Sequence, residues 1–421
     1  MKAFAPYAEQ LRQMVCSWAT SRPSDERIHA SLNGEVKREL RQRVPIKTLR
    51  RSGVFFTGSN LAERLLGLAS FRAYANTRFF DPTCGAGDLL LKAASRFPIC
   101  DSLSETLYNW GARLFGIEKQ AHFVETCRLR LAILALSRGV RPDSADLPTL
   151  LSGIRVGDAL KVTDDYQQAD YVLLNPPYNG VSRSLEWANG NVNAASVFVD
   201  RATDLARPNA RLLSILPEVL RTGARYRKWR ERIQERCSLD RIVGVGRFDA
   251  ETDVDVFLMR SRKLSEKSAN GQDWWSFKAN ERRVGDFFDV HVGPVVPHRH
   301  EEVGPYHPFL HARNATAWTR LHSINENRRF RGTVFNGPFL VVRRTSRPND
   351  PQRAVATVVT CAKPVAIENH LIVCLPKCGT IQLCNKLLKM FQGPVANEYF
   401  NARIRCRHLT IGSVADCPFH T

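Results

Sequence analysis

The sequence predicts an α/β protein with a doubly wound, mostly parallel sheet and a second, smaller domain of mixed α/β structure. Two observations support this prediction. The chain has 421 residues, more than one hydrophobic core usually organises, so we expect two domains. From Arg78 onward, short apolar runs end in turn residues and are followed by helical stretches, as in a parallel sheet with helical crossovers. These runs are RFFD, LFGIE, IRVGD, YVLLN and RLLSILP.

Composition and charge indicate a globular protein that binds a polyanion. Hydrophobic residues make up 43% of the chain and charged residues 24%, so a sizeable core can form. The 61 Lys and Arg residues outnumber the 41 Asp and Glu residues, which gives a formal charge of +20. A field of that sign concentrates polyanions, and nucleic acid is the usual one. The charge therefore predicts a partner and leaves the reaction open.

No segment predicts secretion or membrane insertion. The opening residues, MKAFAPYAEQLRQMVCSW, lack an apolar stretch of signal-peptide length, and no later run approaches the roughly 20 apolar residues that span a bilayer. We therefore expect a cytoplasmic protein without membrane contact. The 11 cysteines are scattered, which fits a reducing compartment. The spacing of Cys361, Cys374, Cys378 and Cys384 is loose and no paired histidines accompany it, so we expect free thiols and no metal.

Three segments follow one another along the chain. Residues 1–52 form a basic helical leader, in which Gly34–Val44 alternates acids and bases as a solvated helix does. Residues 53–290 form the domain with the parallel sheet, and the apolar spacing of His122–Leu136 predicts a helix packed on that sheet. Prolines and glycines in HVGPVVPHRH and VGPYHPF, near residue 290, predict a linker or an irregular surface. Residues 291–421 form the second domain, which is basic, with the strand-like runs PFLVVRR, AVATVVT and HLIVCLP and the helical run IQLCNKLLKMF.

The loop after the first strand suits a nucleotide-like ligand. It lies in DPTCGAGDLL, Asp81–Leu90, where Gly85 and Gly87 permit a tight turn and let a ligand lie against the backbone. The N-terminus of the following helix offers unpaired amide donors. Because a plain turn also explains a lone Gly-x-Gly, the ends of the later strands decide between the two interpretations.

Two later strand ends carry acids. Glu118 ends LFGIE, where a carboxylate can accept hydrogen bonds from both hydroxyls of a ribose. Asp158 and Ala159 follow the strand in IRVGD, where the carboxylate can accept from the exocyclic amine of an adenine ring. The carboxyl ends of parallel strands meet at one edge of a sheet, so these residues predict one shared crevice.

The fourth strand end, after YVLLN, is the tetrapeptide Asn175-Pro176-Pro177-Tyr178. Two prolines fix φ and donate no hydrogen bonds, so the Asn175 side-chain oxygen and the Pro176 carbonyl can both point outward as acceptors. Two acceptors can hold one NH2 group and localise its nitrogen lone pair, while Tyr178 can stack on the attached ring. This pattern predicts chemistry on a planar amino group.

These motifs, in this order, resemble the class I methyltransferases, whose fold is Rossmann-like. They are most similar to DNA adenine-N6 methyltransferases of Eco57I-like and TaqI-like restriction-modification enzymes, in which the cofactor motifs precede NPPY and a target-recognition domain is C-terminal. Gly53–Leu66, GVFFTGSNLAERLL, resembles their motif upstream of the glycine loop, although Thr57-Gly58 stands where the family usually has Thr-Pro. The resemblance covers residues 50–262 by specific motifs.

The resemblance implies S-adenosylmethionine as cofactor and a role for each matching residue. It assigns Asp81, Gly85 and Gly87 to the methionine portion of the cofactor, with Thr57 and Cys84 beside them, Glu118 to its ribose, and Asp158 with Ala159 to its adenine. The catalytic residues it implies are Asn175, Pro176, Pro177 and Tyr178, together with Phe248 in RIVGVGRFDAETDVDVFLMR, which matches the place of an aromatic against the flipped base. A phenylalanine between strands is also commonly a core residue.

The implied substrate is an adenine rotated out of double-stranded DNA. The implied setting is prokaryotic and nucleoid-associated, and we expect a monomer, with room for a separate restriction endonuclease as partner. Two basic stretches are candidates for DNA contact: Arg221–Arg236, which a plain amphipathic helix explains equally well, and Arg343–Arg353, which is loop-like and which we favour.

Three other interpretations stay open. NPPY also occurs in methyltransferases that act on guanine N2 in RNA or on glutamine amides of proteins, although those lack a basic C-terminal domain of this size. A DNA-binding protein that only senses the cofactor is the second. A fused nuclease is the third, since Asp25 and Glu35-Val36-Lys37 have the form of a nuclease motif, but the leader is too short for the sheet that such a site requires. The recognised DNA sequence cannot be predicted.

Overall fold

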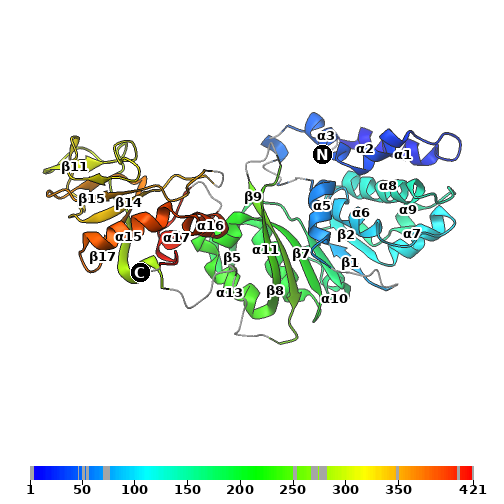
Figure 1. Ribbon diagram of the computed structural model, residues 1–421. Coiled ribbons are helices and arrows are strands. Elements are labelled where there is room, and N and C mark those ends of the chain that lie inside the picture. Colours follow the sequence, from blue (N-terminus) through cyan, green and yellow to red (C-terminus); the bar gives the residue numbers. More distant parts are fainter. Residues whose placement is uncertain are drawn as a thin grey trace. The chain divides into compact units, whose positions relative to one another are not determined.

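The structure is a computed structural model of the chain. It describes residues 4–45, 47–49, 53, 56–69, 76–249, 254–266, 274, 282–347, 350–404 and 408–419. The chain divides into two compact units, Met1–Trp274 and Trp275–Thr421 (Figure 1). The expected boundary near residue 290 falls inside a strand of the second unit, β10 (Phe288–Val292).

The first unit is built on a sheet whose described strands run in the order β3-β2-β1-β4-β7-β9-β8. Neighbouring strands from β3 to β7 are parallel, and β9 is antiparallel to both β7 and β8. The order reverses at β1, so the carboxyl ends of β1 and β4 flank a switch point, where ligands bind in open α/β sheets. The strands are β1 (Phe79–Asp81), β2 (Leu114–Glu118), β3 (Ile154–Val156), β4 (Tyr171–Leu174), β7 (Arg211–Pro217), β8 (Cys237–Arg247) and β9 (Asp255–Lys263).

Helices cover both faces of this sheet, because strand residues alternate between two buried sides. Phe79, Leu173 and Leu213 belong to a core shared with the helices that precede and follow β1 and β2. Phe80 points the other way and packs edge-on against Tyr166. The helices are α5 (Ser59–Leu66), α6 (Asp88–Ala94), α7 (Leu103–Gly111), α8 (Ala121–Ser137), α9 (Leu147–Leu150), α10 (Asp164–Gln168), α11 (Ala194–Leu205), α12 (Glu218–Thr222) and α13 (Arg227–Arg236), with a 3-10 turn, η2 (Ala224–Tyr226).

The leader is integrated into the first unit. Its helices are α1 (Ala5–Cys16), α2 (Asp25–Leu32) and α3 (Glu35–Arg43), and the first two lie along α8 (Figure 1). Phe4 packs edge-on against Phe123 of α8, with 5.1 Å between ring centroids. The helix Glu35–Arg43, expected to be solvated, buries Val36 and Leu40. The leader thus contributes apolar side chains to the core of the sheet domain.

Arg130 of α8 ties the leader to the loop after β1. Its fully buried guanidinium donates to the carbonyl of Ser31 at 2.9 Å and of Leu32 at 3.1 Å, both at the end of α2. The same group donates to the carbonyl of Ala86 at 2.6 Å and to Oδ1 of Asp88 at 2.9 Å. Four acceptors from two distant segments therefore converge on one cation.

The second unit is a mixed α/β structure. Its described strands form the sheets β10-β17-β14-β15-β12 and β13-β11-β16. Helices cover one side of the larger sheet, where Phe391 and Phe400 meet Leu340 and Val358 in a common core. The elements are α14 (Val284–Phe287), β10, β11 (Tyr306–Leu310), β12 (Arg320–Leu321), β13 (Asn327–Arg329), β14 (Phe339–Arg343), β15 (Ala356–Val359), β16 (Ala366–Ile367), β17 (Leu371–Pro376), α15 (Ile381–Gln392), α16 (Pro394–Arg403) and α17 (Ile411–Ala415).

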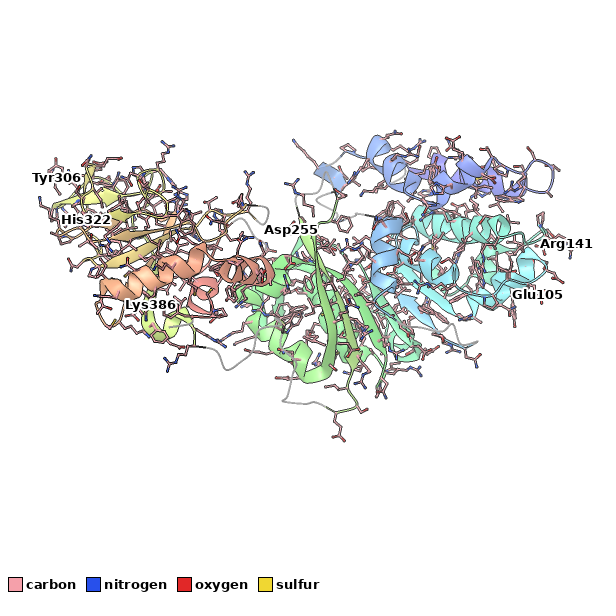
Figure 2. The ribbon with its side chains drawn as sticks, in the orientation of Figure 1. Glu105, Arg141, Asp255, Tyr306, His322 and Lys386 are labelled. Atoms are coloured by element: carbon pink, nitrogen blue, oxygen red, sulfur yellow. The ribbon has the colours of Figure 1, made fainter. Side chains whose placement is uncertain are left out.

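The Pro- and Gly-rich stretches after residue 288 are more ordered than a linker. His291 and Val292 complete β10, and the segment VGPYHPF enters β11. Val295 is fully buried. Tyr306 of β11 is exposed at the surface of this unit (Figure 2), and the Arg329 guanidinium lies 5.0 Å from its ring centroid. Pro308 lies within β11, opposite Asn327, so the prolines here do not remove the segment from the fold.

Within the described ranges, no helix is long and apolar enough to cross a membrane. No group of three or more His, Cys, Asp or Glu side chains in those ranges is arranged to hold a metal ion. Cys361, Cys374 and Cys384 are buried free cysteines, whereas Cys378 is exposed.

Candidate functional site

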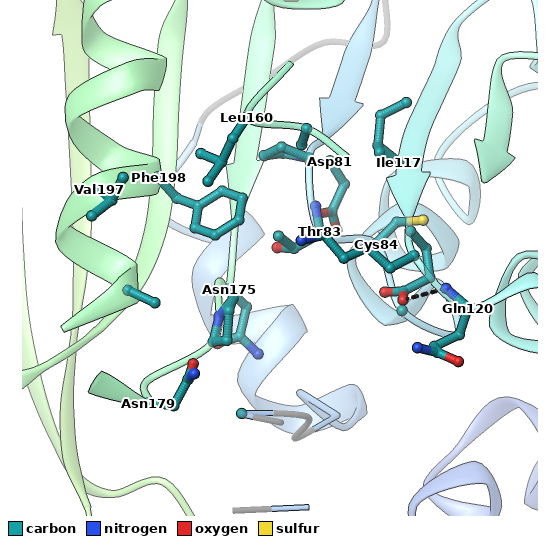
Figure 3. A pocket seen from close by; sticks show the side chains of 18 of the residues that line it. Asp81, Thr83, Cys84, Ile117, Gln120, Leu160, Asn175, Asn179, Val197 and Phe198 are labelled. Atoms are coloured by element: carbon teal, nitrogen blue, oxygen red, sulfur yellow. Dashed lines mark hydrogen bonds between the residues drawn. The ribbon is translucent and has the colours of Figure 1, made fainter. Parts of the chain in front are cut away.

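The strand ends of the first unit enclose one cavity of about 340 Å³ (Figure 3). The loop after β1, the end of β2, the loop after β3 and the segment after β4 all line it, as the strand-end argument predicts. Of the candidate residues, those that line the cavity are Thr57, Asp81, Cys84, Gly85, Glu118, Ala159, Asn175 and Pro177. Those that do not are Gly87, Asp158, Pro176, Tyr178 and Phe248.

The loop after β1 is shaped by its two glycines. Gly85 and Gly87 have φ of +52° and +90°, values that other L-residues rarely adopt. A β-carbon on Gly85 would lie 3.1 Å from the Phe56 ring. The Cys84 amide donates to the carbonyl of Ile117 at 3.0 Å, which fixes the loop to β2, and α6 begins at Asp88. The backbone therefore forms the floor of the cavity at this point.

Gly87→Ala is expected to lower the free energy of unfolding by about 2–4 kcal/mol, because the left-handed backbone and an overlap with Cys127 Sγ both oppose a β-carbon. Gly139→Ala is the matched control. Gly139 has φ of +94° and nothing within 4 Å of a β-carbon, so only the backbone cost of about 1–2 kcal/mol applies. Urea unfolding of both variants measures the difference, and equal losses would contradict the role given to Cys127.

Two carboxyl groups lie in the cavity with raised pKa values. Burial raises the pKa of Asp81 to about 8, although the amide of Thr83 donates to its Oδ1 at 3.0 Å and opposes the rise. Burial also raises the pKa of Glu118, and backbone amides, including that of Gln120 at 2.9 Å, pull it back (Figure 3). Perturbed carboxyls in a cleft are typical of functional sites.

The Asp158 carboxylate does not line the cavity and interacts with neighbouring residues instead. Its Oδ2 lies 3.3 Å from Nζ of Lys119, and its Oδ1 accepts from the amide of Leu160 at 3.1 Å. Partial burial raises the pKa of Asp158, but these two interactions outweigh it and leave the pKa below the ordinary value. Ala159 and Leu160 present their apolar side chains to the cavity instead.

The NPPY segment is held by its own side chains. Nδ2 of Asn175 donates to Oγ1 of Thr57 at 2.8 Å, and Oδ1 of Asn175 accepts from the Tyr178 hydroxyl at 2.8 Å. The same hydroxyl lies 3.1 Å from the carbonyl of Ile215. Sequence reasoning expects the Asn175 oxygen to point outward, whereas here an internal hydroxyl occupies it. Pro176 is buried.

The Tyr178 side chain does not line the cavity. Its ring packs edge-on against Phe248, with 5.9 Å between centroids, so these two aromatic candidates are brought together. Phe248 is buried, and Lys37 Nζ of α3 lies 5.7 Å from its ring centroid. Burial raises the pKa of Tyr178 well above its ordinary value, so the hydroxyl stays protonated and can act as a donor.

Several cavity residues were missed by sequence reasoning. Val197 and Phe198 reach the cavity from α11, and Phe198 points into it near Leu160 and Asn175 (Figure 3). Their spacing in AASVFVDRATDL is that of an ordinary amphipathic helix, so nothing marked them as site residues. Asp88, the first residue of α6, also lines the cavity and could have been found as the acid that ends DPTCGAGD.

The two basic stretches are more buried than expected. In Arg221–Arg236, the side chains of Trp229, Arg230 and Arg236 are buried, which favours the amphipathic-helix interpretation. In Arg343–Arg353, Arg353 is buried and donates to Ser346, Asn401 and the carbonyl of Ile404. That arginine therefore holds the second unit together; residues 348 and 349 lie outside the described residues.

Comparison with known proteins confirms the resemblance over part of the chain. Residues 112–250 match the family described as Eco57I restriction-modification methylase. The match includes Glu118, Asp158, the NPPY segment and Phe248. A search of curated proteins found no match.

Solved structures with a similar fold include restriction-modification proteins and an RNA methyltransferase from Salinibacter ruber. A modification subunit of a putative type I restriction enzyme from Vibrio vulnificus YJ016 is 16% identical, with a TM-score of 0.41 over 67% of this chain and 55% of its own. The type IIG restriction endonuclease BpuSI is 13% identical, with a TM-score of 0.43, and the match covers 93% of this chain and 60% of BpuSI. The type IIL enzyme MmeI, solved in complex with DNA, is 11% identical, with a TM-score of 0.51, and the match covers 94% of this chain and 67% of MmeI.

These likenesses concern the fold. The chain spans 55% and 60% of the first two proteins. The predicted fold class, a mostly parallel doubly wound sheet with further sheets in a second unit, is confirmed.

Proposed function

We propose that this protein transfers a methyl group from S-adenosylmethionine to the N6 amino group of adenine in double-stranded DNA, as part of a restriction-modification or related defence system. One observation carries the proposal. Asn175, which heads the NPPY segment, lines the same cavity as Asp81, Gly85 and Glu118. A group able to hold a planar amine thus shares a cavity with groups suited to a nucleoside cofactor.

The residues present fit that cofactor. Gly85 keeps the floor open to a ligand, Asp81 suits its ammonium group, and Glu118 suits the ribose hydroxyls. Ala159, Leu160 and Phe198 offer apolar surface for the adenine ring, whereas Asp158 would have to turn from Lys119 to reach it. S-adenosylmethionine supplies an already activated methyl group when bound.

The side chains of NPPY would then hold the target. The change of donor at Asn175 is local: its Oδ1 would release the Tyr178 hydroxyl and accept from the incoming amino group, and the Pro176 carbonyl would accept the second hydrogen of that group. Tyr178, released from Asn175, would face the base with Phe248 behind it. The target adenine is reached by rotation out of the duplex.

DNA is favoured over other substrates by two further facts. The chain carries a formal charge of +20, and MmeI, which has a similar fold, was solved in complex with DNA. We propose that residues 291–421 recognise the target sequence. A single copy of the chain, in a prokaryotic cytoplasm and on the nucleoid, with or without a separate restriction endonuclease, suffices for the reaction.

Methyl transfer from labelled S-adenosylmethionine, measured side by side on duplex DNA, RNA and a protein extract, tests the proposal. We expect label in DNA, at N6 of adenine after nucleoside analysis. Label confined to RNA or protein would identify the other amine substrates, and cofactor binding without transfer would identify a sensor. Modification-sensitive sequencing of DNA from cells with and without the protein then gives the recognised sequence.

Cofactor binding is expected to release a proton near neutral pH. Asp81 has a pKa of about 8 because of burial, so it is largely protonated at pH 7, and a cation bound beside it favours the ionised form. Affinity should therefore rise with pH, by at most about tenfold per unit, and level off above the pKa of Asp81. Calorimetry in two buffers of different ionisation enthalpy measures the proton.

Asp81→Asn is the control, because the amide cannot ionise. The variant should lose the proton release assigned to Asp81 and show a flatter dependence of affinity on pH. Identical proton release in both proteins would assign the effect to another group.

A further inference from the structure

The hairpin that follows NPPY places Arg183 at the cavity and lies beside a second cation, Arg225 of η2. It consists of β5 (Gly180–Leu185) and β6 (Ala188–Asn193), paired in antiparallel register. Arg183 lies directly opposite Gly190, and cross-strand partners point to the same face of a hairpin. A β-carbon on Gly190 would point toward Arg225 of η2, whose Nη2 lies 3.7 Å away. Arg183 and Arg225 are therefore on one face, with Gly190 between them.

That face opens on the cavity. Val181 and Arg183, two residues apart on β5, both line it. Gly190 has no side chain and a φ of +87°, so the space between the two guanidinium groups is not filled from β6. Arg225 is held there by a hydrogen bond of 2.9 Å from its Nη2 to the carbonyl of Asn189.

Neither cation is neutralised within the described part of the chain. Arg183 and Arg225 are exposed, and no carboxylate among the described residues forms an ion pair with either. Glu186, the acid nearest to Arg183 in sequence, pairs with Arg232, and Glu231, the acid nearest to Arg225 in sequence, pairs with Arg227 at 3.8 Å. Two exposed guanidinium groups on one face, neither with a carboxylate partner, suit recognition of a phosphate.

The hairpin is fixed to the catalytic segment. Nδ2 of Asn193 donates to the carbonyl of Tyr178 at 2.8 Å, and the amide of Asn193 donates to the Tyr226 hydroxyl at 2.9 Å. At the other end, Nε1 of the buried Trp187 donates to Asp200 at 3.1 Å. A group bound between Arg183 and Arg225 would thus keep a constant position relative to NPPY.

We propose that Arg183 and Arg225 together bind a DNA backbone phosphate beside the target nucleotide, with Gly190 providing the room for it. This inference rests on the proposed function. It adds the two side chains that would hold the DNA backbone beside the extruded nucleotide at the cavity. A phosphate contact here positions the nucleotide and carries no sequence information.

The test is binding of labelled duplex DNA across a range of salt concentrations, in the presence of S-adenosylhomocysteine to prevent turnover. The variants are Arg183→Ala with Arg225→Ala, and Arg183→Lys with Arg225→Lys. The alanine pair is expected to weaken binding about tenfold and to reduce the slope of log affinity against log salt by about one. The lysine pair should keep most of the slope, because charge is retained.

Arg141→Ala is the matched control. Arg141 is an exposed arginine of the same unit outside the cavity lining (Figure 2), and its removal should leave affinity and slope unchanged. Unfolding temperatures of all variants show that the fold is intact. Wild-type affinity and slope in the alanine pair would overturn the inference while leaving the proposed function in place. Failure of the wild-type protein to bind DNA would overturn both.

Discussion

Asn175→Ala is expected to reduce the rate of methyl transfer to DNA by about 10²–10³-fold, with little change in cofactor affinity. The substitution removes the Oδ1 acceptor that the proposed mechanism gives to the amino group, while the Pro176 carbonyl remains. The fold should tolerate the change. Only two side-chain hydrogen bonds are lost, to Thr57 and from Tyr178, and the Tyr178 hydroxyl keeps the carbonyl of Ile215 as acceptor. Single-turnover kinetics with labelled cofactor, alongside calorimetry, separate the two effects.

Asn179→Ala provides the matched control. Asn179 lines the same cavity. Its backbone carbonyl accepts a hydrogen bond from the amide of Ala194 at 2.9 Å, and this contact with α11 remains when the side chain is removed. We expect its rate to stay within about tenfold of wild type. Methylation by Asn175→Ala at the wild-type rate would remove the basis for the proposed catalytic role.

Arg130→Met is expected to lower the free energy of unfolding of the first unit by about 3–5 kcal/mol. Arg130 is fully buried and pairs with Asp88, whose side chain is 7% exposed. Without the guanidinium, the Asp88 carboxylate keeps the Gly58 amide, at 2.8 Å, but loses its counter-ion, and the carbonyls of Ser31 and Ala86 lose a donor. Urea unfolding followed by circular dichroism measures the loss.

The control is an exposed ion pair at the same interface. Arg12 of α1 pairs with Glu125 of α8, and its side chain is 49% exposed, so Arg12→Met should cost no more than about 1 kcal/mol. Adding Asp88→Asn to Arg130→Met should recover part of the stability, since the unpaired charge is then gone. Similar losses of unfolding free energy from Arg12→Met and Arg130→Met would show that burial of the Arg130–Asp88 pair does not increase its contribution to stability.

The strand ends could be predicted because they depend on local pattern. RFFD, LFGIE, IRVGD and YVLLN each read as a strand, and parallel topology then brings their ends together whatever lies between. The glycines after β1 have the positive φ that the Gly-x-Gly pattern predicts. Fold class and most cavity-lining candidates therefore follow from residues close in sequence.

The rest depends on contacts between distant segments. Arg130 lies among the charged residues between the apolar ones of α8, where a solvated position is the ordinary expectation, and the packing of α2 and of the loop after β1 against α8 buries it. The hydrogen bond from Tyr178 to Asn175 depends on how NPPY folds back on itself. The hairpin Gly180–Asn193 carries weak strand signals, because Ser, Asn and Gly replace the β-branched residues that mark strands. Sequence pattern alone identifies none of these three.

The packing of the leader on α8 also sets an order of events during synthesis. Residues 4–44 leave the ribosome before α8, and Phe4, Tyr7 and Leu11 complete their packing only when Phe123 and the rest of α8 have been made. Until then these apolar side chains are exposed on a nascent chain and offer a binding surface for chaperones. Burial of the leader therefore waits for residue 137, the end of α8, and a ribosome stalled before that point would display a segment prone to aggregation.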